Sequence, residues 1–143
     1  MRVLGVDPGD KNIGLALSDP SATIANPLMV IEHVSRLIDA ASIANVASQN
    51  GVSKIIVGQS LDIDGRPSFQ GRKANRLAAA IRTQTDLPVI LWDEAYSTQE
   101  ARAAQIEMDV SRSRRRGHLD ELAATVILQS YLDREIPPEE RNR

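Results

Sequence analysis

The grouping of apolar residues along the chain limits the fold more than any other feature of this sequence. Three short apolar runs come first, and longer stretches with helical spacing then alternate with two further short runs. Short runs are typical of strands, and apolar residues that recur every three or four positions are typical of helices. The sequence therefore predicts an α/β domain whose sheet begins with a meander of three strands.

The first three predicted strands are separated by turn residues. The first covers Val3–Val6, and the second starts at Ile13, after which apolar and small residues alternate. The turn over Gly9–Asn12 is short enough for these two strands to pair antiparallel. A third strand is expected within Ala22–Ile31, where Pro27 implies an edge position or a bulge because proline lacks a backbone N–H.

Stretches with helical spacing predict four helices. Ser35 is expected to cap the first, and Asn50-Gly51 to end it. A short helix is expected to begin at Ser97 or Thr98, and the last helix near Leu119. The core-facing positions predicted for the second and last helices are Ala74, Leu77, Ala78, Ile81 and Thr85, and Leu122, Ala123, Val126, Ile127 and Leu132.

Two more strands are expected between these helices, at Lys54–Gly58 and Pro88–Glu94. The first is a bounded apolar run of the kind found in buried parallel strands. The chain has 143 residues and no internal repeat or linker, which is typical of one compact domain. We therefore expect a single domain over residues 1–135 and a disordered polar tail over residues 136–143.

The composition excludes several kinds of site. The chain has no cysteine, so disulfides and thiolate metal sites are absent and any metal must bind oxygen or imidazole. No stretch approaches the roughly 20 apolar residues of a membrane helix, and no signal-peptide pattern is present, so we expect a soluble, cytoplasmic protein. The formal net charge of −2 and the pI of about 5.7 indicate no overall attraction to nucleic acid.

Acidic residues stand where predicted strands end and where the last helix starts. Asp7 follows the first strand. Asp93 and Glu94 close the fifth, and Asp120 opens the last helix. Ligands of α/β sheets bind beyond the carboxyl ends of strands, so these carboxylates can converge. Each alone is explained by a turn or a helix cap, but together their repulsion calls for a cation, and oxygen ligands suit Mg²⁺ or Mn²⁺.

Five segments carry a resemblance to a known family. In order and spacing, they are VLGVDPGDKNIGLALSD, ANPLMVI, KIIVGQSLDIDG, WDEAYSTQEA and GHLDELAATVILQSYLD. They resemble the YqgF/RuvX family of Holliday junction resolvase-like proteins, also described as pre-16S rRNA nucleases, over nearly the whole chain. The resemblance implies a ribonuclease H-like fold with a mixed five-stranded sheet flanked by helices. It also implies metal-dependent cleavage of a phosphodiester bond in the bacterial cytoplasm.

The resemblance also implies roles for the acidic residues. Asp7 matches the family's first-strand aspartate, Glu94 the glutamate of its Asp-Glu-Arg motif, and Asp120 the acid of its last helix. These three would be catalytic, and Asp93 would assist as a direct or indirect metal ligand. Two Mg²⁺ or Mn²⁺ ions held about 3.5–4 Å apart by such residues can activate a water and stabilise the leaving oxygen of a phosphoryl transfer.

Basic residues and glycines near these acids are candidates for contacts with substrate phosphates. Lys11 matches a basic position of the family, and Gly9 and Gly14 would let a phosphate approach the backbone closely. A solvated lysine and ordinary turn or strand glycines are equally good interpretations. A basic run directly precedes Asp120. The candidate contacts in that run are Arg112, Arg114, Arg115, Arg116 and His118, and a second patch would comprise Arg66, Arg72, Lys73 and Arg76.

Two positions depart from the family pattern, and two other functions stay open. Ala95 stands where an arginine usually follows the Asp-Glu pair, and Ser60 where a proline is usual. These changes put rate and substrate preference in doubt but leave the acidic residues in place. The first segment is also similar to the phosphate loop of actin and sugar kinases, although those proteins generally need two such domains.

The other alternative is a non-catalytic nucleic-acid or ribosome-assembly module, which would gain nothing from three repelling carboxylates. The expected partner is nucleic acid, either precursor rRNA or branched DNA, and no membrane. The sequence does not choose between these substrates or between a monomer and a homodimer. Symmetric cleavage of a four-way junction would require the dimer.

Overall fold

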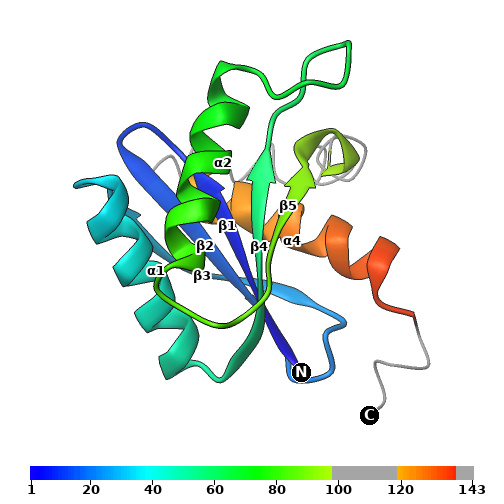
Figure 1. Ribbon diagram of the computed structural model, residues 1–143. Helices are drawn as coiled ribbons and strands as arrows, with labels where there is room; N and C mark the ends of the chain where they lie inside the picture. The colour runs from blue at the N-terminus through cyan, green and yellow to red at the C-terminus, as the bar shows by residue number, and fades with distance from the viewer. Residues whose placement is uncertain (98–118, 138–143) are drawn as a thin grey trace.

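The computed structural model describes residues 1–97 and 119–137, and it confirms the α/β architecture (Figure 1). One five-stranded sheet has the order β3-β2-β1-β4-β5. The strands are β1 (Arg2–Pro8), β2 (Asn12–Ser18), β3 (Ala25–Glu32), β4 (Val52–Gln59) and β5 (Val89–Asp93). The helices are α1 (Arg36–Gln49), α2 (Phe69–Arg82) and α4 (Leu119–Glu135), and the 3₁₀ turn η1 (Glu94–Ser97) follows β5.

The sheet is mixed, as predicted. β2 pairs antiparallel with both β1 and β3, whereas β4 pairs parallel with both β1 and β5. Both expectations for Pro27 are confirmed, because β3 is an edge strand and its register with β2 shifts between Met29 and Pro27. The carboxyl ends of β1, β4 and β5 consequently meet at one edge of the sheet, with β4 in the middle.

The ends of α1 and α2 follow from local signals. The Ser35 hydroxyl accepts a hydrogen bond from the Ile38 N–H at 3.2 Å, and α1 ends at Asn50 before Gly51, whose φ of +62° favours glycine. Ser68 caps α2. The predicted face of α2 is buried except at Thr85, which lies beyond the end of the helix, so that part of the prediction was wrong.

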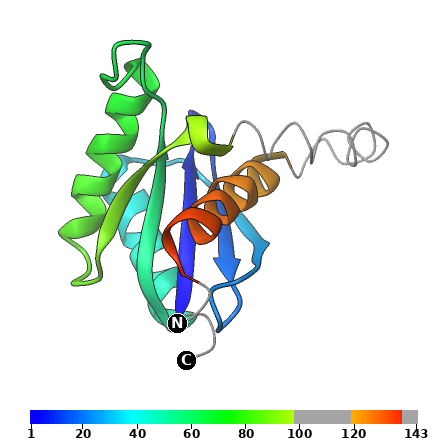
Figure 2. The same ribbon diagram turned by 90° about the vertical axis from the view of Figure 1, so that its right-hand side faces the viewer.

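Two layers of helices cover the sheet, with α1 and α2 on one face and α4 on the other (Figures 1 and 2). Alternate residues of β1 divide between the two cores: Leu4 and Val6 pack with α1 and α2, and Val3 packs with α4. Ile136, one residue past α4, is also buried in the second core. Within residues 1–97 and 119–137, no helix is long and apolar enough to cross a membrane.

α4 packs on the sheet with a different face from the one its spacing predicts. Ile127 and Leu132 are buried as expected, but the other three predicted positions are only partly buried. The remaining buried positions of the helix are Ala124, Leu128, Ser130 and Tyr131. The helix carries apolar residues of its own on nearly all sides, so their spacing alone does not indicate which face is buried. Gly5 in β1 permits the observed face to pack closely, because an added Cβ there would lie 2.7 Å from Leu128 Cβ.

Candidate active site

β1 and β5, the two strands that flank β4, bring predicted acidic residues to the same edge of the sheet. Asp7 is the penultimate residue of β1, Asp93 is the last residue of β5, and Glu94 begins η1. All three side chains are half-buried. Because β4 lies between β1 and β5, Asp7 and Glu94 stand on either side of its carboxyl end.

Asp7 lies on the α4 face of the sheet. It is four residues from Val3, which packs in the core with α4, and side chains alternate between faces along a strand. In the antiparallel pairing of β1 with β2, Asp7 is opposite Gly14. The residue opposite Asp7 therefore adds no side chain beside the carboxylate.

Gly58, near the end of β4, lets the side chains of Glu94 and Ile127 pack closely over the strand. A Cβ added at Gly58 would lie 3.4 Å from both Cγ and Oε1 of Glu94, and 2.9 Å from Cδ1 of Ile127 in α4. Any larger side chain at this position would displace Glu94 or Ile127. The strand pattern alone does not identify Gly58 as a functional candidate, because a glycine at this position also fits the end of a strand. The available signal was a glycine within a buried strand, which often marks a close approach by another group.

The surroundings of Glu94 favour its neutral form. Burial raises the pKa of Glu94, and the adjacent Asp93 carboxylate raises it further. Asp93 also has a local role, because its Oδ1 accepts a hydrogen bond from the Ala95 N–H at 2.9 Å. A bound cation would offset the cost of ionising Glu94, and the carboxylate oxygens of Asp7, Asp93 and Glu94 are ligands of the kind that divalent ions prefer.

The third predicted acidic residue stands near the start of α4. Asp120 is the second residue of that helix, and its side chain lies outside the described part of the chain. One turn later, the carbonyl oxygen of Ala124 lies 3.3 Å from the Cβ position of Gly5, two residues before Asp7. The helix backbone thus approaches β1 beside the strand end. Among the residues that the structure describes, no three His, Cys, Asp or Glu side chains are grouped as metal ligands.

An aromatic cluster joins the Glu94 segment to α4. The indole N–H of Trp92 donates to the Ser130 hydroxyl at 2.8 Å, and its ring meets Tyr131 edge to face at 5.2 Å. Tyr96 of η1 packs on Trp92 at 4.9 Å, and the Arg134 guanidinium lies 4.7 Å from the centre of the Tyr96 ring. These contacts hold β5, η1 and α4 together, which positions Glu94. They also confirm Trp92 as a core residue.

The other predicted contacts are placed only in part. Lys11 is exposed in the turn between β1 and β2. A Cβ at Gly9 would lie 2.3 Å from the Asn12 carbonyl oxygen, so the turn itself requires this glycine. The basic run and the short helix expected after Ser97 fall within residues 98–118, outside the described residues. The predicted contacts in that run are Arg112, Arg114, Arg115, Arg116 and His118.

A profile of the RuvX family, described as "Holliday junction resolvase", matches residues 1–134. The chain belongs to the RuvX family. A relative from Caldanaerobacter subterraneus subsp. tengcongensis, named "Putative pre-16S rRNA nuclease", is 42% identical over 134 residues, covering 93% of this chain and 96% of its own. A Myxococcus xanthus protein of the same name is 37% identical over 139 residues, with coverages of 97% and 92%.

Solved structures show the same fold at low sequence identity. Thermus thermophilus RuvC, solved with a Holliday junction substrate, has a TM-score of 0.62 and 16% identity, with 92% of each chain covered. The fowlpox virus resolvase, solved with Holliday junction DNA, has a TM-score of 0.59 and 13% identity, covering 96% of this chain and 100% of its own. The predicted ribonuclease H-like fold is therefore confirmed, and RuvX membership decides against the actin and sugar-kinase alternative.

The two departures from the RuvX pattern lie at this edge of the sheet. Ala95 is exposed in η1, directly after Glu94. Ser60 follows β4, and its carbonyl oxygen accepts hydrogen bonds from the Ser68 N–H at 2.9 Å and the Ser68 hydroxyl at 3.1 Å. The backbone of Ser60 thus anchors the start of α2, a role that a proline carbonyl would also fill.

Proposed function

We propose that this RuvX-family chain is a divalent-metal-dependent nuclease that hydrolyses phosphodiester bonds in structured nucleic acid. The observation that carries the proposal is the placement of Asp7 and Glu94 on either side of the carboxyl end of β4, with the Glu94 side chain packed over Gly58. The names of the relatives point to processing of pre-16S rRNA, and cleavage at its 5′ end is the activity that we propose first. Resolution of Holliday junctions is the second candidate, which the family description supports.

The proposed metal ligands are Asp7, Glu94 and Asp120, with Asp93 as a direct or indirect ligand. Two bound Mg²⁺ or Mn²⁺ ions would supply an activated water and stabilise charge on the leaving oxygen. Asp7 is held on the central strand of the sheet. Glu94 is held by η1 and the Trp92 cluster, so neither acid has to reorganise when substrate binds.

Substrate phosphates would be held by cations near the acids. Lys11 is exposed in the turn that directly follows β1, and the basic residues before α4 would add further contacts. Such contacts position a strand without reading its sequence. We therefore expect selection by the shape of the nucleic acid rather than by its bases.

Cleavage assays with matched substitutions test this proposal. The native chain is incubated with Mg²⁺ or Mn²⁺ and, in parallel, a 5′-extended 16S rRNA precursor fragment and a four-way DNA junction. Asp7→Asn, Glu94→Gln and Asp120→Asn should each abolish cleavage. Asp86→Asn is the control, because Asp86 is exposed and precedes β5 at the opposite edge of the sheet.

Each outcome leads to a different conclusion. Loss of cleavage of one substrate in the first three variants, but not in the control, would support the nuclease and identify its nucleic acid. Cleavage that survives Asp7→Asn would refute the assigned site. Binding of both substrates without cleavage of either would favour the non-catalytic module.

A further inference from the structure

A second candidate site lies on the face of the sheet that α1 and α2 cover. It is a pocket of about 340 Å³ beside the carboxyl end of β1, lined by the β1–β2 turn, the end of β3, α1 and α2. Its ionisable lining residues are Asp10, His33, Arg36, Asp39, Lys73 and Arg76. None of them belongs to the candidate active site, which lies on the α4 face.

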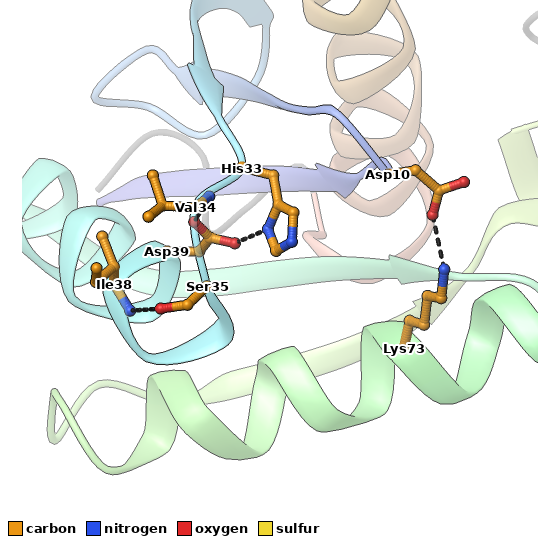
Figure 3. A network of polar contacts seen from close by, with 7 residues as sticks. All are labelled: Asp10, His33, Val34, Ser35, Ile38, Asp39 and Lys73. Atoms are coloured by element: carbon orange, nitrogen blue, oxygen red, sulfur yellow. Dashed lines mark hydrogen bonds and ion pairs between the residues drawn. The ribbon is translucent and has the colours of Figure 1, made fainter.

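Both carboxylates of this pocket already have partners (Figure 3). Asp39 is only 3% exposed; it accepts a hydrogen bond from the Val34 N–H at 3.0 Å and pairs with Nδ1 of His33. Asp10 pairs with the Lys73 ammonium at 2.8 Å. Each carboxylate of the pocket is therefore already engaged, Asp39 by the His33 ring and the Val34 N–H, and Asp10 by the Lys73 ammonium.

The two arginines of the pocket are unmatched. Within residues 1–97 and 119–137, neither Arg36 nor Arg76 has an ion pair or a side-chain hydrogen bond. Arg36 is also the first residue of α1, where the positive end of the helix dipole disfavours a cation. An anion bound between the two side chains would relieve both conditions, and the planar guanidinium group suits phosphate oxygens.

We propose that this pocket binds a backbone phosphate of the nucleic-acid substrate, away from the bond that is cut. The inference rests on the proposed function, because it assumes a nucleic-acid substrate. Pro8 and Gly9 of the pocket directly follow Asp7, so a strand that crosses the end of β1 reaches both sites. Arg36 and Arg76 are exposed, which leaves them accessible to a passing strand.

His33 adds a further group to this phosphate pocket. Its Nδ1 is engaged by Asp39, and Figure 3 shows the other ring nitrogen on the side of the ring away from Asp39. Of the predicted basic patch of Arg66, Arg72, Lys73 and Arg76, only Lys73 and Arg76 line the pocket. Arg36, which completes it, comes from a different helix.

The test measures binding separately from cleavage. Fluorescence anisotropy in EDTA gives the affinity of the full chain for the labelled precursor fragment and four-way junction over a range of salt concentrations. Arg36→Gln and Arg76→Gln should each weaken binding about tenfold, as expected for a lost hydrogen bond to a charged group. Each should also lower the slope of log affinity against log salt by about one.

Arg2→Gln is the matched control. It removes the same charge at the opposite end of β1, where the one side-chain hydrogen bond of Arg2 within the described residues is a long 3.4 Å contact with the Ser18 carbonyl oxygen. Equal effects of all three variants, or no effect of Arg36→Gln and Arg76→Gln, would overturn the proposal. Stabilisation by inorganic phosphate that Arg36→Gln removes, without any change in nucleic-acid affinity, would also overturn it and indicate a small-anion site.

These outcomes are separable from those of the cleavage assay. If the native chain cuts nothing but the two arginine variants bind more weakly than the control, the phosphate pocket stands and the nuclease does not. If cleavage occurs and the arginine variants bind normally, the nuclease stands and the phosphate pocket does not.

Discussion

The Gly58→Ala substitution adds one methyl group beside Glu94, and its effect on cleavage can be compared with its effect on the stability of the fold. The added methyl group would lie 2.9 Å from Ile127 Cδ1, about 0.6 Å inside an ordinary carbon–carbon contact of roughly 3.5 Å. That atom is the end of a flexible side chain, so we expect it to rotate away. The loss in unfolding free energy should be about 1 kcal/mol, at the low end for an overpacked core.

The effect of Gly58→Ala on activity should be much larger than its effect on stability. The same methyl group would stand 3.4 Å from Glu94 Cγ and Oε1, so it would press on the carboxylate that we propose as a metal ligand. A displacement of up to about 1 Å in such a site lowers rates by up to about a hundredfold. We expect cleavage by Gly58→Ala to fall by between about tenfold and a hundredfold, and to need more Mg²⁺ or Mn²⁺.

Gly5→Ala is the comparison for stability. Its methyl group would lie 2.7 Å from Leu128 Cβ and 3.3 Å from the Ala124 carbonyl oxygen, and neither atom is at the end of a flexible side chain. α4 would have to shift, which should cost about 3 kcal/mol, at the upper end for overpacking. Urea unfolding followed by the fluorescence of Trp92, the one tryptophan in the chain, measures both variants. If Gly58→Ala cleaves at the wild-type rate and with the wild-type metal dependence, the proposed role of Gly58 beside Glu94 is refuted.

Three further substitutions have expected outcomes. Glu94→Gln should abolish cleavage but raise the unfolding free energy in EDTA at neutral pH. Because the pKa of Glu94 is raised in the folded state, the wild-type protein loses stability as pH rises through that pKa and the carboxyl group ionises. The stability that Glu94→Gln gains should therefore vanish below the ordinary glutamate pKa. Ser130→Ala should cost about 1–3 kcal/mol in urea unfolding, because it leaves the buried Trp92 N–H without its acceptor. Backbone N–H groups, that of Ile24 foremost, and the Ser21 hydroxyl lower the pKa of Asp19 to about 2. The stability that Asp19 adds should therefore be present above its ordinary pKa of 3.8 and lost as pH falls through about 2, which unfolding of Asp19→Asn and wild type across that window measures.

Local signals predicted the parts of the fold that local chemistry controls. Ser35 caps α1 through its own hydroxyl, and Pro27 requires an edge or a bulge whatever else the chain does. The face of α4 could not be predicted in this way, because it depends on the absence of a side chain at Gly5, more than a hundred residues away. The end of α2 before Thr85 was missed because the apolar spacing continues past the last helical residue.

The candidate site also has a part that the sequence predicts and a part that depends on contacts between distant residues. Asp7 and Glu94 were predicted to converge because the carboxyl ends of strands meet at one edge, and the structure places them on either side of β4. Their roles remain predictions. Gly58 was not predicted, because its importance comes from the side chain of a neighbouring strand end rather than from its own sequence context. The sequence also does not indicate that Arg36 and Arg76 line the same pocket, since they lie on two separate helices that only the fold brings together.

The net charge of the chain is a poor guide to its affinity for nucleic acid, and the pocket shows why. A formal charge of −2 is a sum over the whole surface, and it includes carboxylates such as Asp39 that are buried and paired. A phosphate interacts mainly with charges within about 10 Å at moderate salt. At the end of β1, both carboxylates of the pocket have partners, whereas its two guanidinium groups have none among the described residues. Affinity should therefore depend on Arg36 and Arg76 far more than on a charge of the same sign elsewhere, which is the difference that Arg2→Gln measures.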